Sequence, residues 1–265
     1  MRKIFLEVQK QMNDKISYLT DYLLDEMPEY KQSAQSIHDP KMLLRSLMNV
    51  RPPMKLSPDF LKVQDEYLSS ERESKGVVDV EALPEILPHI SLWQGDITRL
   101  KADAIVNAAN SELLGCFIPC HRCIDNAIHS AAGLQLRDEC YHLMTEQGHD
   151  EPTGSAKITK GYNLPAKHVI HTVGPIVRGK LTGEHRKELE SCYRSCLELA
   201  ENEGLKSIAL CCISTGEFHF PNDEAASIAV RTVRDFLMKA ESVNRVVFNV
   251  FKASDMMIYR RELAK

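Results

Sequence analysis

Hydrophobic and polar positions follow one pattern before residue 85 and another after it. In residues 1–75 apolar side chains recur at helical spacing, as at Ile16, Leu19 and Leu23, and glycine is scarce. Apolar residues three and four positions apart lie on one face of a helix. We therefore assign residues 1–85 to an N-terminal helical extension.

Two residue pairs that end in proline mark helix starts within this extension. Asp39 followed by Pro40, and Ser57 followed by Pro58, are typical of an N-cap residue with proline in the first helical turn. The helix that begins after Asp39 should end before Pro52, because proline disrupts a helix interior. The simplest interpretation is an extension that packs on the rest of the chain, and docking of a partner protein is the alternative.

From residue 86 onward, short apolar runs alternate with longer helical patterns. Runs rich in β-branched residues predict strands at 90–93, 104–107, 168–172, 207–213 and 245–251. Helical patterns occupy residues 124–144, 184–203, 222–239 and 255–264. This alternation indicates one α/β domain over residues 86–265, with a largely parallel sheet covered by helices on both faces.

Polar side chains gather where the predicted strands end, which is where parallel sheets bind ligands. Asn107 and Asn110 flank two alanines, and small residues let a ligand approach the backbone. Asparagine at a strand end also caps or turns the chain, which is its usual role. After the first strand, Asp96 can accept hydrogen bonds from an exocyclic amine, although Gly-Asp alone is more often a simple turn.

The segment 211–221 links a predicted strand to a helix. Ser214, Thr215 and Gly216 can present amides and hydroxyls to phosphate oxygens near a helix N-terminus. The segment lacks the lysine of a P-loop, so nucleotide hydrolysis is not expected there. For Phe218, stacking on a ribose and packing in the core are both open.

A short loop, residues 115–126, combines three cysteines, a histidine and a carboxylate. Thiolate and imidazole are the ligands that zinc takes in proteins. The adjacent Cys120 and His121 are difficult to direct at one ion, so a closed site with four ligands from this loop would be strained. Unligated thiols are the alternative interpretation.

Composition restricts the other classes of function. The formal net charge of −4 provides no basic field for nucleic acid. The chain has no run of 18 apolar residues to cross a membrane, and its start turns polar too soon for a signal peptide. Eight cysteines without a secretory signal favour a cytoplasmic protein with free thiols or metal ligands. We expect five of them in the core: Cys140, Cys192, Cys196, Cys211 and Cys212.

A succession of motifs resembles the macrodomain, an ADP-ribose-binding fold. In chain order the motifs are GDIT at 95–98, DAIVNAANS at 103–111, IHSAAG at 128–133, KGYNLP at 160–165, HVIHTVGP at 168–175 and ISTG at 213–216. The resemblance covers roughly residues 88–264. It implies a three-layer α/β/α macrodomain with a mixed, largely parallel central sheet.

The asparagine-rich block and the run that follows it are similar to the MacroD-type hydrolases, in which a glycine run leads into a helix that carries an aspartate. Here Asp125 matches that aspartate, but cysteines and a histidine replace the glycines and the loop is longer. This departure resembles the zinc-dependent macrodomains of microbial protein-ADP-ribose hydrolases, which also carry an N-terminal helical extension. A second departure is His219, where many macrodomains have glycine.

The resemblance implies roles for individual residues. Asp96 and Ile97 would meet adenine, with Phe251 stacked on it, and Asn110 and Asp125 would face the distal ribose as catalytic groups. The diphosphate would be held by Ser214, Thr215, Gly216, Glu217 and Phe218. The metal ligands of one zinc per chain would be Cys116, His121 and Cys123, which leaves Cys120 as an extra cysteine. Asn107 would support the site, while His129, His168 and His171 would be structural.

The implied function is a hydrolase that removes mono-ADP-ribose from protein side chains, most simply from aspartate or glutamate, with an active-site zinc. A lipoyl-carrier protein would be its ADP-ribosylated target and a sirtuin-type ADP-ribosyl transferase its functional partner. The alternatives are a reader that binds ADP-ribose without turnover and an esterase that acts on O-acetyl-ADP-ribose. The attacking water could be activated by zinc, by Asp125 or by the diphosphate of the substrate.

Overall fold

The computed structural model describes residues 2–265. The extension is helical, as predicted, and consists of α1 (Arg2–Glu26), a 3₁₀ turn (Pro28–Tyr30), α2 (Lys31–Ala34), α3 (Pro40–Val50) and α4 (Pro58–Lys75). Asp39 caps α3 by accepting hydrogen bonds from the amides of Lys41 and Met42. Ser57 caps α4 by accepting from the amide of Phe60. Both predicted helix starts are confirmed.

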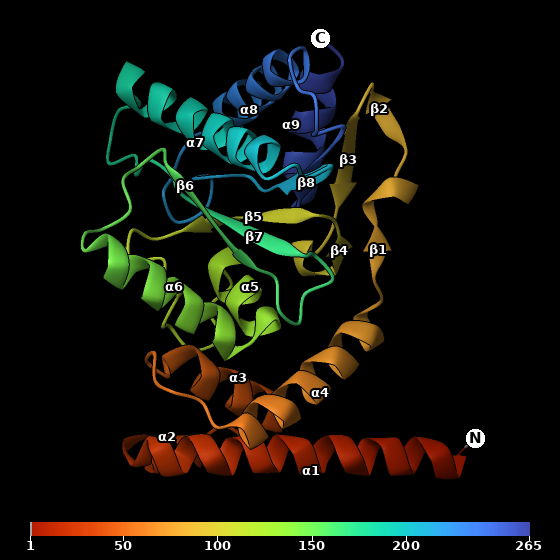
Figure 1. The fold of residues 1–265 in the computed structure, drawn as a ribbon, viewed down its shortest axis with the longest axis vertical. Helices are drawn as coiled ribbons and strands as arrows, with labels where there is room; N and C mark the ends of the chain where they lie inside the picture. The colour runs from red at the N-terminus through yellow and green to blue at the C-terminus, as the bar shows by residue number, and fades with distance from the viewer. Residues whose placement is uncertain (1) are drawn as a thin grey trace.

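A seven-stranded sheet forms the centre of the molecule (Figure 1). Its order is β2 (Glu85–Leu87), β3 (Ile90–Gln94), β9 (Arg245–Val250), β8 (Ser207–Leu210), β5 (Ala104–Ala109), β7 (His168–Val173) and β6 (Ala156–Lys160). The five inner strands run parallel, and both edge strands are antiparallel to their neighbours. The predicted mixed, largely parallel sheet is confirmed. A separate parallel pair joins β1 (Val78–Asp79) to β4 (Leu100–Lys101).

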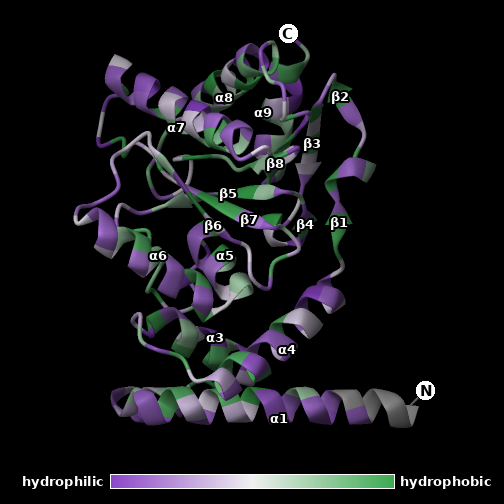
Figure 2. Ribbon diagram, viewed as in Figure 1, coloured by the Kyte–Doolittle hydropathy of each residue, from purple (hydrophilic) through white to green (hydrophobic). Residues whose placement is uncertain are grey.

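Helices cover both faces of the sheet. One layer holds α7 (Gly183–Asn202), α8 (Asn222–Leu237) and α9 (Ala253–Leu263), and the opposite layer holds α5 (Ile124–Ala132) and α6 (Leu134–Gln147) (Figure 1). Central strands such as β5 consist mainly of hydrophobic residues, while the outer helices carry both hydrophobic and hydrophilic residues (Figure 2). This is the three-layer α/β/α arrangement expected from the sequence.

Two hydrophobic clusters stabilise the two parts of the chain. One surrounds the sheet, and the other lies between α1, α3 and α4, with Leu19, Leu23 and Phe60 completely buried. The extension packs beneath the α5 and α6 layer (Figure 1), and Leu134 of α6 belongs to its cluster. The division into residues 1–85 and 86–265 stays a prediction.

Two predicted elements are wrong in detail. The helix expected over 124–144 is interrupted at Gly133, whose φ of 97° ends α5 and begins α6. The break depends on packing, because Gln64 of α4 accepts a hydrogen bond from the amide of Leu134. The strand expected over 207–213 ends at Leu210, where the chain turns into the loop that follows.

The cysteines are unpaired throughout the described chain. Four of the five expected in the core are buried there, but Cys212 is only half-buried and lines a cleft. Across residues 2–265, each helix is too short or too polar to cross a bilayer.

Candidate functional site

A cleft of about 1150 Å³ opens at the carboxyl ends of the parallel strands. Loops after β3, β5, β8 and β9 form one side, and α3 and α4 of the extension form the other. The structure brings all the candidate site residues to this cleft: Asp96, Ile97, Asn110, Cys116, His121, Cys123, Asp125, Ser214, Thr215, Gly216, Glu217, Phe218 and Phe251. Their individual roles stay predictions.

Asp96 and Phe251 occupy the end of the cleft that follows β3 and β9. Asp96 caps a short 3₁₀ turn, where Oδ1 accepts hydrogen bonds from the amide of Thr98 (3.0 Å) and from its hydroxyl (2.7 Å). This arrangement leaves Oδ2 for a ligand. Phe251 is 74% exposed. A carboxylate beside an exposed aromatic ring can hold a flat base that carries an amino group.

The loop 214–218 after β8 presents its backbone to the cleft. In the part of the chain that the structure describes, the amides of residues 216–218 have no protein acceptor, and the buried hydroxyl of Ser214 has no partner. Ser214 has a φ of 63° and lies against Gly174, where an added Cβ would be only 2.0 Å from the Ser214 hydroxyl. Such a row of free amides suits an anion.

Comparison with Phe220 shows which of the two interpretations of Phe218, stacking on a ligand or packing in the core, fits the structure. Phe218 is half-buried and lines the cleft, whereas Phe220 is 1% exposed and belongs to the core. Phe218 is therefore placed where it can touch a ligand. His219 has a φ of 56°, a left-handed backbone conformation that glycine adopts more readily than other residues.

Asn107 lies within β5 and Asn110 directly follows it, and the two side chains have different surroundings. Asn110 accepts from the amide of Glu112 (3.1 Å) and donates to the carbonyl of Gly115 (3.0 Å), so its side chain shapes the start of the metal loop. Asn107 is completely buried, and its Nδ2 donates to Asp125 Oδ1 at 2.8 Å. This contact agrees with a supporting role for Asn107.

Asp125 lies in the first turn of α5 and is 5% exposed. Burial raises the pKa of Asp125 to about 6, and the hydrogen bond from Asn107 and the charge of Arg137 limit the rise. His129 Nε2 lies 3.5 Å from Asp125 Oδ1, a distance that suits an ion pair. However, burial lowers the pKa of His129 well below its ordinary value. The pair therefore consists of a carboxylate and a neutral imidazole at neutral pH.

Behind Asp125, a buried polar cluster continues into the sheet. Nδ1 of His171 lies 3.2 Å from Asn107 Nδ2, and Nε2 of His171 lies 3.0 Å from the hydroxyl of Thr159. These contacts favour the neutral tautomer with the proton on Nε2, because Nδ1 must then accept from Asn107. Burial lowers the pKa of His171 to about 3. His171 is thus structural, as predicted, and it supports the residue that holds Asp125.

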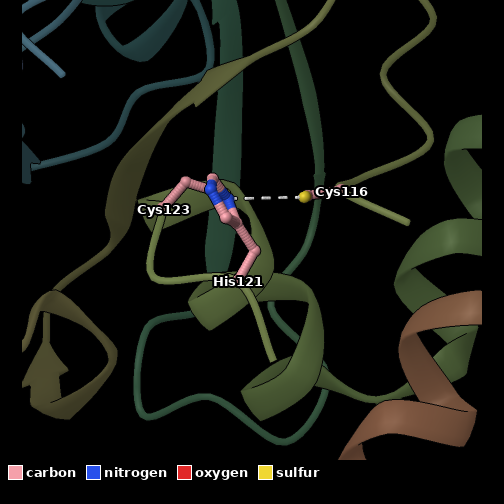
Figure 3. Close-up of side chains that lie close together, drawn as sticks. All are labelled: Cys116, His121 and Cys123. Atoms are coloured by element: carbon pink, nitrogen blue, oxygen red, sulfur yellow. Dashed lines mark hydrogen bonds between the residues drawn. The ribbon is translucent and has the colours of Figure 1, made fainter. Parts of the chain in front are cut away.

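Cys116, His121 and Cys123 converge at the start of α5 (Figure 3). Their candidate ligand atoms all lie within 4.8 Å of one another, and Cys116 Sγ is 3.7 Å from His121 Nδ1. Two ligands of a tetrahedral zinc, with Zn–S of about 2.3 Å and Zn–N of about 2.0 Å, lie about 3.5 Å apart. The three residues therefore fit a zinc ion with one open position.

The electrostatic surroundings of Cys123 also suit a cation. Burial raises the pKa of the Cys123 thiol to about 12, and the neighbouring Cys116 and Asp125 add to the rise. A bound cation would offset these effects and stabilise the thiolate. Cys123 Sγ also accepts a hydrogen bond from the amide of Asn126 (3.4 Å) as the N-cap of α5. The partial positive charge of a helix N-terminus favours thiolate as well.

Cys120 is directed away from this triad. Its Sγ lies 3.3 Å from the hydroxyl of Ser46 and 3.5 Å from the carbonyl of Met42, both on α3. Cys120, which the sequence predicts to be an extra cysteine, contacts the extension instead of the candidate metal position.

The wall formed by the extension was missed in the sequence analysis. It contributes Arg45 of α3 and Tyr67, Arg72 and Lys75 of α4. Arg72 and Lys75 are three residues apart and so share a helix face. That spacing was a readable signal for a basic face, but no local pattern indicated that the face would meet the loops of the sheet.

The comparisons with known proteins agree on one family. Residues 106–229 match the family described as Macro domain. A protein-ADP-ribose hydrolase of Treponema medium is 51% identical over 250 residues, which cover 92% of this chain and 96% of that protein. The unmatched 8% of this chain is about 21 of its 265 residues. Even if all of them lie at the N-terminus, the match begins before α3 and includes it.

Two further proteins extend the comparison. A probable bifunctional ADP-ribose hydrolase/ADP-ribosyltransferase of Fusarium oxysporum f. sp. cubense is 42% identical over 95% of this chain, which spans 46% of that protein. A solved macrodomain of Trypanosoma brucei in complex with ADP-ribose has a TM-score of 0.64 and 33% identity, and covers 82% of this chain and 94% of its own.

Proposed function

We propose that this chain, which belongs to the macrodomain family, is a hydrolase that removes mono-ADP-ribose from modified side chains of proteins and uses one zinc. One observation carries the proposal: Asp125 and the Cys116, His121 and Cys123 triad lie together at one end of a cleft whose middle presents free amides. In the sheet, β3 and β9 are followed by β8 and then β5, so the loops after these strands would meet the base, the diphosphate and the distal ribose in that order.

Binding is assigned to the residues that can recognise each part of the ligand. Asp96 Oδ2 would accept from the adenine amine, and Phe251 would stack on the ring. The amides of residues 216–218 would hold the diphosphate, because they are free to donate. The distal ribose would then reach Asp125. Together these contacts orient the anomeric carbon towards the end of the cleft that carries the triad.

Asp125 would act as the general base. A water attacks the anomeric carbon, the bond between that carbon and the protein-derived oxygen breaks, and the water gives its proton to Asp125. The products are free ADP-ribose and the restored side chain. A base with a pKa of about 6 is ionised at neutral pH but still accepts a proton effectively. Asn107 keeps the carboxylate in place through its 2.8 Å hydrogen bond.

Zinc, when bound to Cys116, His121 and Cys123, supplies a Lewis acid that holds or polarises an oxygen. The donor set of two thiols and one imidazole fits zinc and leaves one position open, as catalytic zinc sites do. A zinc held by these residues would lie near Asp125, which is two residues after Cys123, and so near the distal ribose in the proposed binding mode.

We further propose an aspartate- or glutamate-linked adduct as the substrate. A carboxylate leaving group departs without needing a proton, so one base is sufficient. At this end of the cleft, burial lowers the pKa of His129 well below its ordinary value. Its imidazole is therefore neutral and poorly suited to donate a proton to a leaving group. A lipoyl-carrier protein is the proposed target, and a sirtuin-type ADP-ribosyl transferase the proposed functional partner. The bifunctional relative supports a link between hydrolase and transferase.

The test is incubation of a carrier protein modified on glutamate with purified enzyme, and measurement of released ADP-ribose. Wild-type protein should contain about one zinc and release free ADP-ribose. Asp125→Ala should keep its zinc and slow release by roughly 10²–10⁴. Cys123→Ala should lose both the zinc and nearly all release while it keeps its fold. Binding without release would identify a reader, and faster turnover of O-acetyl-ADP-ribose would identify an esterase. Full activity of zinc-free Cys123→Ala would refute the use of zinc.

A further inference from the structure

Helix α3 of the extension makes direct hydrogen bonds to the metal loop, residues 115–123. Asn49 Oδ1 accepts from the backbone amide of Cys120 at 2.9 Å. Arg45 Nη2 lies 3.5 Å from the carbonyl of His121. Cys120 Sγ lies 3.3 Å from the hydroxyl of Ser46. Contacts from two successive turns of one helix therefore hold the middle of the loop.

Arg45 also holds the loop through Asn126, which is completely buried in the first turn of α5. Arg45 donates to Asn126 Oδ1 from Nη2 at 2.7 Å and from Nε at 3.3 Å. Asn126 Nδ2 donates in turn to the carbonyls of Ile118 (3.0 Å) and Cys116 (3.4 Å). One guanidinium thus connects α3 to both halves of the loop, through Asn126 and through the carbonyl of His121.

The loop needs such support because its conformation is unfavourable by itself. Cys120 has a φ of 51°, in the left-handed region that is unfavourable for residues other than glycine. Residues 115–123 contain no helix or strand. Such a conformation persists when surrounding contacts over-determine it. Cys120 lies between the ligands Cys116 and His121, so its backbone conformation decides where both side chains point.

We propose that α3 is part of the metal site, and that Arg45 and Asn49 are positioning residues that hold Cys116, His121 and Cys123 in their ligating arrangement. The proposal rests on the zinc site proposed above. It gives the extension a role beyond packing: it forms the outer shell of the metal centre. Partners of this kind typically change metal affinity by about 10–100-fold when removed.

Whether substitution of Arg45 strengthens or weakens zinc binding distinguishes a positioning role from a purely electrostatic one. Removing a positive charge near a cation should strengthen zinc binding, because repulsion is lost. Loss of positioning should weaken it. Arg45→Met removes the charge and all hydrogen bonds to the loop but keeps the length of the side chain. Lys41→Met is the matched control, because Lys41 lies one turn earlier on α3 and pairs with Glu71 at 2.6 Å instead of the loop.

The experiment is a zinc competition titration against a chromophoric chelator, with circular dichroism of the metal-free proteins. We expect Arg45→Met and Asn49→Leu to bind zinc about 10–100-fold more weakly than wild type. Lys41→Met should bind zinc as tightly as wild type or more tightly. If Arg45→Met does not fold, Arg45→Lys tests positioning alone, since it keeps the charge but loses the paired contact to Asn126; it too should bind zinc more weakly than wild type.

The outcomes distinguish the two proposals. If wild type and Lys41→Met bind zinc and Arg45→Met binds it equally well, positioning by α3 is wrong and the zinc site stands. If wild type binds no zinc at all, the zinc-dependent function and the role of α3 both fail. Unchanged ADP-ribose affinity of metal-free Arg45→Met, measured by calorimetry, would confirm that the effect is confined to the metal loop.

Discussion

The buried histidines behind Asp125 should make this protein sensitive to acid, and the size of the effect can be calculated. His171 is completely buried with a pKa of about 3, against an ordinary value of about 6.5 in the unfolded chain. At pH 5 the unfolded state therefore binds a proton that the folded state does not. A lowered folded-state pKa means that stability is present above pH 6.5 and is lost as the pH falls.

Integration of this difference from pH 8 to pH 5 gives a loss of about 2 kcal/mol from His171 alone. The value hardly depends on the folded-state pKa as long as that pKa stays below about 4. His129, whose pKa also lies well below the ordinary value, adds a loss of the same sign. Asp125 opposes both, because its pKa is raised to about 6 and protonation below that pH favours the folded state.

The assay is urea denaturation of wild type and His171→Asn at pH 8 and pH 5. Asparagine keeps an acceptor near the position of Nδ1 for Asn107 and does not titrate. Between pH 8 and pH 5 the free energy of unfolding of His171→Asn should fall by about 2 kcal/mol less than that of wild type, whatever the stability of the variant at pH 8. His142→Asn is the control, because the His142 side chain is 73% exposed and should lose as much as wild type. Equal losses for His171→Asn and wild type would refute the buried neutral histidine.

Two further predictions concern the adenine end of the cleft. Asp96→Asn keeps the Oδ1 that caps the turn but places an amide donor where the adenine amine would donate. It should weaken ADP-ribose binding about 5- to 150-fold, or about 1–3 kcal/mol, without a change in melting temperature; unchanged affinity in calorimetry would mean that adenine binds elsewhere. Phe251→Ala should also weaken ADP-ribose binding by about 1–3 kcal/mol, because stacking on the base is lost. Because its ring is 74% exposed, stability should not change, and a fall in melting temperature would indicate a packing role.

The sequence was sufficient where the signal is local. The caps at Asp39 and Ser57 and the five parallel strands depend on neighbouring residues, and the structure confirms them. Gly133 shows the limit, because the break in the predicted helix is stabilised by Gln64 of another helix, which accepts from the amide of Leu134, 70 positions away. The edge strand β6 was missed because lysines alternate with its apolar residues and only one of its five residues, Thr159, is buried.

In the candidate site, too, some residues could be located from local sequence signals and others could not. Residues that follow strands could be located from motifs, because parallel strands deliver their loops to one edge of the sheet. The contacts of Arg45 and Asn49 could not be located, since the face of α3 that meets the loop is decided by how the extension packs on α5. The orientation of Cys120 depends on the same packing.

Two different supports hold Asp125 and the metal loop. The sheet holds Asp125 through Asn107 of β5, which lies opposite His171 of β7 in the strand register. The extension holds the metal loop through α3. The two supports come together at the first turn of α5, where Cys123 and Asp125 are two residues apart. Damage to α3 should therefore reduce zinc affinity while Asp125 keeps its place, and damage to Asn107 should displace the base while zinc stays bound. Such separation follows only if the two groups are positioned by different layers of the molecule.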